Sequence, residues 1–121
     1  MRRWIGLSIA AVALLHLAAT FAIYPVGIAA AVSYTLSGSI PPASIESEAF
    51  WFAMFAPFLF LFGVMVDRTE RGGTSLGWLV VLVFSLSLVA LIAPMPATGA
   101  WLLVPAGVGM WVRELRLARR V

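Results

Sequence analysis

The chain has 121 residues, of which 63% are hydrophobic and 11% are charged, and its net charge is +3. Soluble domains are about 45–50% apolar and about 25% charged, so this chain lacks the polar side chains to cover a soluble surface, and lipid is the expected solvent. It contains no cysteine, which excludes disulfides, thiolate metal sites and cysteine nucleophiles. Its basic residues are arginines that flank apolar runs, which favours a membrane over a nucleic acid as the partner.

Four apolar runs approach the length of about 20 residues that a membrane-spanning helix needs. No internal repeat or linker divides the chain. We therefore predict one all-α domain over residues 1–121, an integral membrane four-helix bundle. Its expected spans are 4–24, 48–66, 76–92 and 98–112.

The placement of the arginines predicts the orientation. Four alternating spans bring every arginine to one side, and an excess of basic residues marks the cytoplasmic side of a membrane protein. We therefore expect a multi-pass membrane protein with both termini in the cytoplasm. The first run also has the charged start of a signal peptide, but it is longer than the apolar core of such peptides, so we interpret it as a span. The arginines are Arg2, Arg3, Arg68, Arg71, Arg113, Arg116, Arg119 and Arg120.

The first run contains the only histidine of the chain, His16. On a helical wheel His16 shares a face with Ala13 and Thr20, whereas Leu7 and Leu14 lie on the opposite face. Small residues let a neighbouring helix approach closely, so we expect His16 to point into the bundle. An ionisable side chain at that depth is a candidate for function. The alternative is a structural histidine that bonds to backbone or serine.

Residues 25–47 form a long outer connection between the first two spans. Connections of this length are often lids or binding loops. The simpler expectation is an interfacial helix over Ile28 to Tyr34, followed by a turn rich in serine, glycine and proline. In either case the segment would cover the outer end of the bundle.

The second run begins at Glu48 and is rich in aromatic residues. Pro57 lies inside this run and removes the hydrogen bond that the carbonyl of Ala53 would accept, so that oxygen is a candidate partner for His16, as are the serines of the third run. Direct pairing with Glu48 is disfavoured because the two side chains lean in opposite directions. Glu48 has an alternative role in the first turn of a helix, where acids favour the helix dipole. The candidate ligand-binding residues are His16, Thr20, Glu48, Trp51, Phe52 and Phe55.

Charged segments at the inner side are expected to be solvated. Residues 67–71, DRTER, are predicted as a loop between the second and third spans. Arg113 is expected to extend its guanidinium to the lipid headgroups and so lengthen the short fourth span. Residues 113–120 are predicted to continue the fourth helix and to contact anionic lipid.

Several local motifs follow one another along the chain. They are a glycine and a later histidine in the first run, FWF at the start of the second, LGW in the third, and a turn of proline, small residues and glycine before a tryptophan. In this succession the chain resembles an uncharacterised bacterial family of small four-helix membrane proteins. The resemblance covers nearly the whole chain except the outer connection. It implies the fold and a multi-pass location in the bacterial plasma (inner) membrane, and it implies no catalytic residue.

The leading functional hypothesis is a membrane protein that binds a lipid or lipophilic small molecule in an outward-facing pocket between helices, because such pockets are mostly apolar with a few placed polar groups. The alternative is a membrane-embedded enzyme, of isomerase or cyclase type, in which His16 and Glu48 act as acid and base on a terpenoid or polyketide. A proton-coupled exporter working as a homo-oligomer and an accessory subunit of a membrane complex stay open. The expected partners are the lipid bilayer and a lipophilic molecule, with no nucleic acid, metal or cofactor.

Overall fold

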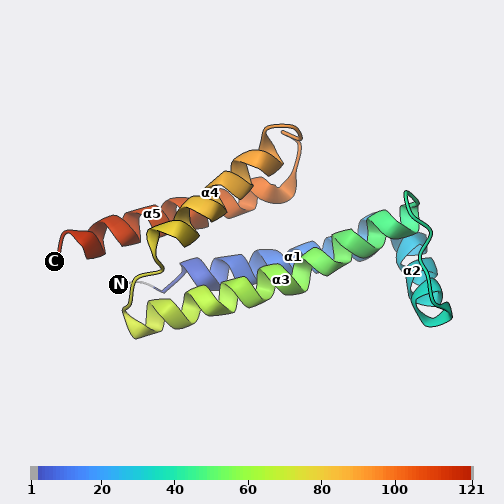
Figure 1. Cartoon of the computed structure of the whole chain (residues 1–121), viewed down its shortest axis with the longest axis horizontal. Helices are drawn as coiled ribbons and strands as arrows, with labels where there is room; N and C mark the ends of the chain where they lie inside the picture. Colours follow the sequence, from blue (N-terminus) through green and yellow to red (C-terminus); the bar gives the residue numbers. More distant parts are fainter. Residues whose placement is uncertain (1–2, 121) are drawn as a thin grey trace.

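The computed structural model describes residues 3–120, and the regular structure within them is entirely helical (Figure 1). The predicted all-α class is therefore confirmed, while Arg2 lies outside the described residues. The described chain has more helices than the four expected, because the outer connection is mostly helical and the fourth run begins with a separate 3-10 helix. In chain order the elements are α1 (Ile5–Ile23), α2 (Pro25–Ser37), α3 (Ile45–Gly72), α4 (Trp78–Ile92), the 3-10 helix η1 (Gly99–Leu103) and α5 (Val104–Ala118).

A proline separates α1 from α2. The single residue between them, Tyr24, has a φ of −122° and a ψ of 50°. A residue before proline is pushed away from helical geometry, which ends α1, and Pro25 then suits the first position of α2. α2 lies across one end of the molecule (Figure 1), which we call the α2 end. The expectation of a helix over residues 28–34 is thus confirmed, and the helix is longer at both ends.

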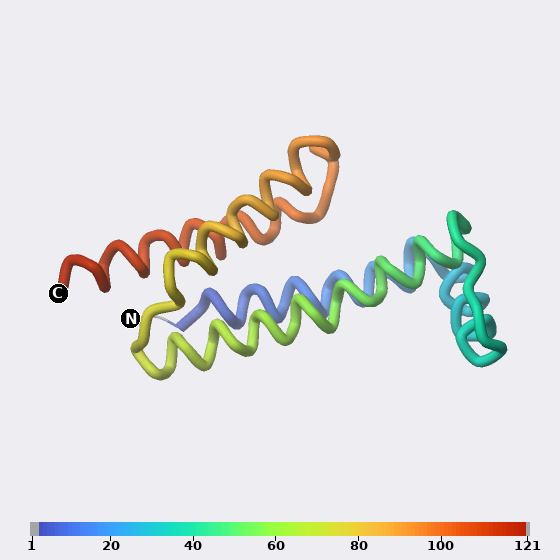
Figure 2. Tube along the Cα trace, in the orientation of Figure 1, coloured from blue at the N-terminus to red at the C-terminus, as the bar shows by residue number. Residues whose placement is uncertain are grey.

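α1 and α3 form a tight antiparallel hairpin, visible as two adjacent tubes in Figure 2. A Cβ atom added at Gly6 would lie 2.2 Å from the backbone nitrogen of Asp67, so the two backbones touch there. Small residues permit such an approach, and a seven-residue repeat keeps them facing the partner helix. The small residues buried along this seam are Gly6, Ala13 and Thr20 on α1, and Ala49, Ala56 and Gly63 on α3.

The segment predicted as a loop over residues 67–71 is instead the end of α3, so that prediction is wrong. Arg71 Nη2 lies 2.8 Å from Asp67 Oδ2, one helical turn earlier, and this ion pair stabilises the last turns. Gly73 then ends the helix with a φ of 67°, the left-handed conformation that glycine adopts readily. Glu70 is partly buried and bonds to the backbone of α1, and Asp67 is only 8% exposed.

α4, η1 and α5 form a second hairpin, which splays away from the first (Figure 1). The backbones of α5 and η1 approach α1, but within residues 3–120 no Cα atom of α3 lies within 8 Å of a Cα atom of α4. Side chains bridge the two helices, and the rings of Phe62 and Phe84 stack with their centroids 5.3 Å apart. The fourth predicted span, 98–112, is divided between η1 and the first part of α5.

Both described chain ends lie at the end opposite α2 (Figure 2), which we call the arginine end because Arg3, Arg68 and Arg113 lie there.

The chain exposes 7960 Å² of surface, whereas a compact monomer of its 13.0 kDa mass exposes about 6,300 Å². By length and composition two helices, α1 and α3, could cross a membrane, while α4 is a shorter apolar helix. Three exposed side chains on one face of α1, Leu7, Leu14 and Phe21, agree with the predicted outward face.

Candidate functional site

His16 joins α1 to α3 in the half of the first hairpin that is nearer the α2 end. Its Nε2 lies 2.8 Å from the carbonyl oxygen of Phe52. Because a carbonyl oxygen only accepts, Nε2 is the nitrogen that carries the proton. The imidazole also stacks on the Phe52 ring with a centroid separation of 4.1 Å, and it meets the Phe55 ring edge-on at 5.3 Å. This arrangement gives Nε2 a hydrogen-bond partner and holds the imidazole ring in one orientation.

The acceptor lies one residue before Ala53, the residue whose carbonyl Pro57 was predicted to free. α3 continues as a helix through Pro57. The His16 ring stacks on the Phe52 ring, and its Nε2 bonds to the carbonyl of Phe52 and not to that of Ala53. The serines of α4 are not partners of His16. Ser85 and Ser87 donate to carbonyls one turn earlier in their own helix.

Four of the six predicted site residues come together around this contact. Thr20 is fully buried, and its hydroxyl donates to the His16 carbonyl at 2.9 Å. The rings of Phe52 and Phe55 contact the imidazole as described, and Tyr24 adds a further ring 5.5 Å from Phe52. The arrangement packs α1 against α3 near the α2 end.

The other two predicted residues, Glu48 and Trp51, do not join the cluster. Glu48 is exposed in the first turn of α3, and Trp51 is 68% exposed. Within residues 3–120 no hydrogen bond or ring contact connects either of them to His16. The structure therefore does not assemble the predicted acid–base pair, and the position of Glu48 fits the alternative in which an acid favours the helix dipole.

An apolar groove of about 510 Å³ lies between α3 and α4, where the two backbones stay apart. Phe55 is part of its wall, so the groove begins beside the ring that contacts His16. Its one hydroxyl, on Ser87, already donates to the Val83 carbonyl. The lining residues are Phe55, Phe58, Leu59, Phe62, Leu79, Val80, Val83, Phe84, Ser87, Leu88, Leu91 and Leu103.

The arginine end contains polar contacts that the sequence reasoning missed. Glu70 of α3 accepts hydrogen bonds from the backbone nitrogens of Ile5 at 3.4 Å and Gly6 at 2.8 Å. It thereby satisfies two of the free amides at the start of α1 and places a negative charge at the positive end of that helix. One signal was present in the sequence: α1 begins without a serine, threonine, aspartate or asparagine cap, so its amides required partners from elsewhere.

A second group at this end is built around Arg113 and Glu114, which are 5% and 3% exposed. Arg113 donates to the carbonyls of Thr69 and Thr74 and lies 3.1 Å from Glu114. Glu114 also accepts from the Leu76 backbone nitrogen and from a serine hydroxyl. The prediction that Arg113 extends to the headgroups is therefore wrong, because its guanidinium binds the backbone where α3 leads into α4.

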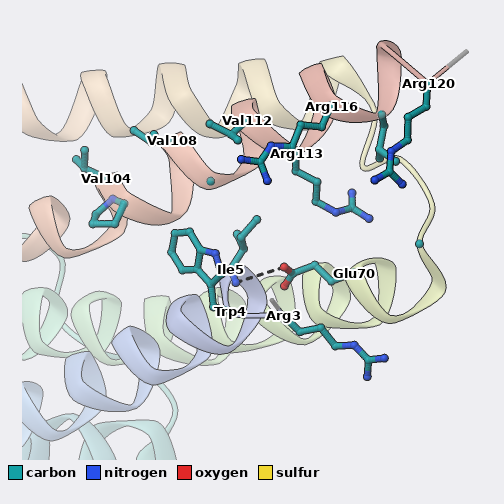
Figure 3. Close-up of a pocket in the computed structure, with 14 residues that line it drawn as sticks. Arg3, Trp4, Ile5, Glu70, Val104, Val108, Val112, Arg113, Arg116 and Arg120 are labelled. Carbon is teal, nitrogen blue, oxygen red and sulfur yellow. Dashed lines mark hydrogen bonds between the residues drawn. The ribbon is translucent and has the colours of Figure 1, made fainter. Parts of the chain in front are cut away.

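A larger cavity of about 1000 Å³ lies next to this group, between the start of α1 and the length of α5 (Figure 3). Figure 3 shows Val104, Val108 and Val112 following one another along α5, and Arg116 and Arg120 continuing the same line toward the arginine end. Trp4, Ile5 and Glu70 lie across from them, on α1 and α3. The cavity therefore has an apolar section and a basic section.

Within residues 3–120 no group of three or more histidine, aspartate and glutamate side chains lies close enough to hold a metal ion.

Comparisons with known proteins identify a family for this chain but no function. No curated protein and no solved structure matches the chain. The family of unknown function DUF6463 matches residues 1–117, which confirms the predicted resemblance to an uncharacterised family. With nearly its whole length matched, the chain belongs to the DUF6463 family.

Proposed function

We propose that this chain is a multi-pass protein of the bacterial inner membrane that binds a hydrocarbon chain, from a lipid or another lipophilic molecule, in the groove between α3 and α4. The groove is the observation that carries the proposal. Its lining is almost wholly apolar, and a lipophilic ligand needs an apolar cavity of about 300–1,000 Å³. The ligand position differs from the one expected around Glu48, because the groove lies on the α4 side of α3.

Exposed apolar side chains support the membrane part of the proposal. The most apolar 18-residue windows of α1 and α3 are each only 28% buried. Large side chains on α4 are also exposed, with Leu79 at 74% and Leu86 at 67%. An apolar surface this continuous is typical of a protein in contact with lipid.

The distribution of charge supports the orientation. The basic residues within 3–120 lie at the arginine end, and Glu46 and Glu48 open α3 at the α2 end, so the arginine end would face the cytoplasm. A cysteine introduced at Ser39, near the α2 end, should react with a membrane-impermeant maleimide in intact cells, whereas one at Arg119 should not. The chain has no cysteine of its own, so labelling of the Arg119 variant from outside would reject this orientation.

His16 has a defined part in this proposal. Its bond to Phe52 and its contact with Phe55 hold two aromatic rings in place, and Phe55 forms part of the groove wall. His16 is thus a positioning residue that shapes the groove. The acid–base enzyme is not carried further, because Glu48 lies away from His16, and no observation favours an exporter or an accessory subunit.

The experiment is photolabelling of the full chain in phosphatidylcholine nanodiscs with a palmitic acid that carries a diazirine in its chain. We expect labelling at the groove residues Phe58 and Val83 to exceed labelling at Leu14 by roughly tenfold. Leu14 is 58% exposed on α1 and reports general lipid contact. A tenfold excess corresponds to about 1.4 kcal/mol of preference of the fatty acid for the groove. Excess unlabelled palmitic acid should reduce the groove labelling and leave Leu14 unchanged.

A matched pair of variants controls for general lipid contact. Val83→Trp would fill the groove and should abolish the excess labelling at Phe58. Leu82→Trp adds the same ring at the neighbouring position, which is exposed and lines neither cavity described above, so labelling should stay at the wild-type level. Uniform labelling of α1, α3 and α4, or an equal loss in both variants, would reject the groove as a binding site.

A further inference from the structure

We infer that the cavity at the arginine end binds one anionic phospholipid, with its phosphate among the arginines of α5 and one acyl chain along the valines of the same helix. This inference concerns a second site and does not depend on the function proposed for the α3–α4 groove. It rests on the shape of the cavity, on its division into an apolar and a basic section, and on the arginines that the fold leaves available.

The division arises from one stripe of α5. Residues four positions apart lie on nearly the same face of a helix. Starting from Val104, this spacing gives Val108 and Val112, and then Arg116 and Arg120. All five line the cavity, so its wall changes from apolar to basic along α5 and just past the end of that helix at Ala118 (Figure 3). A phospholipid has the same order of chain and charged headgroup.

The basic section contains arginines that no other group of residues 3–120 engages. Arg113 is engaged by Glu114 and by backbone carbonyls, and Glu70 is engaged by the amides of α1. Within residues 3–120 no ion pair or hydrogen bond occupies the guanidiniums of Arg116 and Arg120, two residues that line the cavity, whereas the side chain of Arg3 points away from them (Figure 3). Two such positive charges beside one occupied carboxylate favour an anion, and guanidinium groups bind phosphate oxygens in a paired geometry.

The opposite wall suits the boundary between headgroup and chain. Trp4 is 41% exposed and lines the cavity, and its ring lies against Gly109, where an added Cβ would come within 2.8 Å of the indole. Tryptophan favours the membrane interface because its ring is apolar and its N–H is polar. The cavity volume of about 1000 Å³ accommodates a headgroup and part of one chain.

The test is native mass spectrometry of the full chain in detergent, with palmitoyl-oleoyl phosphatidylglycerol and the matching phosphatidylcholine added at equal concentrations. We expect one phosphatidylglycerol molecule to bind in preference to phosphatidylcholine. Arg116→Gln with Arg120→Gln should weaken that binding at least about tenfold, because each basic residue near a lipid phosphate contributes severalfold to affinity. Equal binding of the two lipids by the wild-type chain would overturn the inference.

The control removes the same charge from the same end of the molecule. Arg68→Gln with Arg119→Gln changes two exposed arginines that do not line the cavity, so the affinity for phosphatidylglycerol should change less than twofold. An equal loss in the two double variants would mean that net charge alone attracts the lipid. Inorganic phosphate at millimolar concentration should fail to displace the lipid; displacement would indicate a site for a soluble anion and reject the acyl-chain contact.

A further pair tests the apolar section without altering charge. Val108→Trp would fill the part of the cavity where the chain is placed and should also weaken phosphatidylglycerol binding about tenfold. Val89→Trp, an exposed position of α4 that lines neither cavity described above, should leave it unchanged. Full binding by the Val108 variant would contradict the placement of the acyl chain along α5.

Discussion

The two hairpins of this protein are held together in different ways. In the first, α1 and α3 meet backbone against backbone along a seam of small residues repeated every seven positions. In the second, α4 and α5 meet through side chains, and an added Cβ at Gly107 would lie 3.3 Å from the flexible Leu88 Cδ1. The second hairpin is tied to the first at the arginine end by buried charge. Tight backbone packing thus joins α1 to α3, whereas apolar side chains and a polar anchor, the buried Arg113–Glu114 pair with its backbone partners, hold the second hairpin and leave a groove between α3 and α4.

The largest effect is expected from removal of the polar anchor. Glu114→Ala would leave the buried guanidinium of Arg113 without its carboxylate and the Leu76 amide without its acceptor. Breaking a buried ion pair from one side costs about 3–5 kcal/mol, so we expect a large fall in unfolding temperature in detergent. Spin labels at Phe58 and Val83 should also move apart as the second hairpin detaches. An unchanged distance between the labels would show that apolar contacts alone position α4.

A smaller loss is expected at the seam of the first hairpin. Gly6→Ala would place a methyl group against the α3 backbone, which cannot move aside as a side chain can. Overpacking of this kind costs about 1–3 kcal/mol. Gly107→Ala is the matched substitution in the second hairpin, where the neighbour is a flexible leucine, and should cost less than about 0.5 kcal/mol. The comparison is made by thermal unfolding, and similar losses for the two variants would contradict the contrast between the hairpins.

The smallest effect concerns His16. His16→Leu would leave the Phe52 carbonyl without its side-chain donor, at a cost of about 0.6–1 kcal/mol for a hydrogen bond within a membrane protein. His16→Gln keeps a donor and should recover part of that stability. Both variants should retain palmitic acid labelling at Val83, on the far side of the groove from α1, because His16 only positions the aromatic wall. Complete loss of labelling in His16→Gln, with normal unfolding, would instead make His16 a ligand-contacting residue.

The sequence predicted the helices better than the contacts between them. Apolar runs and prolines marked α1, α3 and α4 to within a few residues at most ends, because these signals are local. The face of α1 was also predictable, since Ala13 and Thr20 are small and Leu14 is large. The end of α3 was misplaced because charged residues 67–71 look like a solvated loop in isolation, whereas Glu70 and Thr69 bond to α1 and to Arg113 of α5, which are distant in the chain.

The candidate site was predicted only in part for a similar reason. His16, Thr20, Phe52 and Phe55 were identified because polar and aromatic side chains stand out on helical faces that must pack. Glu48 was included on its helical face alone, and the structure leaves it exposed in the first turn of α3. The groove depends on how far α4 stands from α3, and no residue pattern within either helix encodes that separation.

Because the polar anchor lies at the start of α4, a small rotation of the helix there produces a larger displacement at its other end. The link from α3 spans only residues 73–77, and Gly73 and Gly77 both have positive φ, at 67° and 86°. α4 has 15 residues and is about 22 Å long, so a rotation of about 10° at the link displaces its far end by about 4 Å. We expect the width of the groove at the far end of α4 to follow the bulk of whatever occupies the groove, and the distance between spin labels at Phe58 and Val83 would report that width.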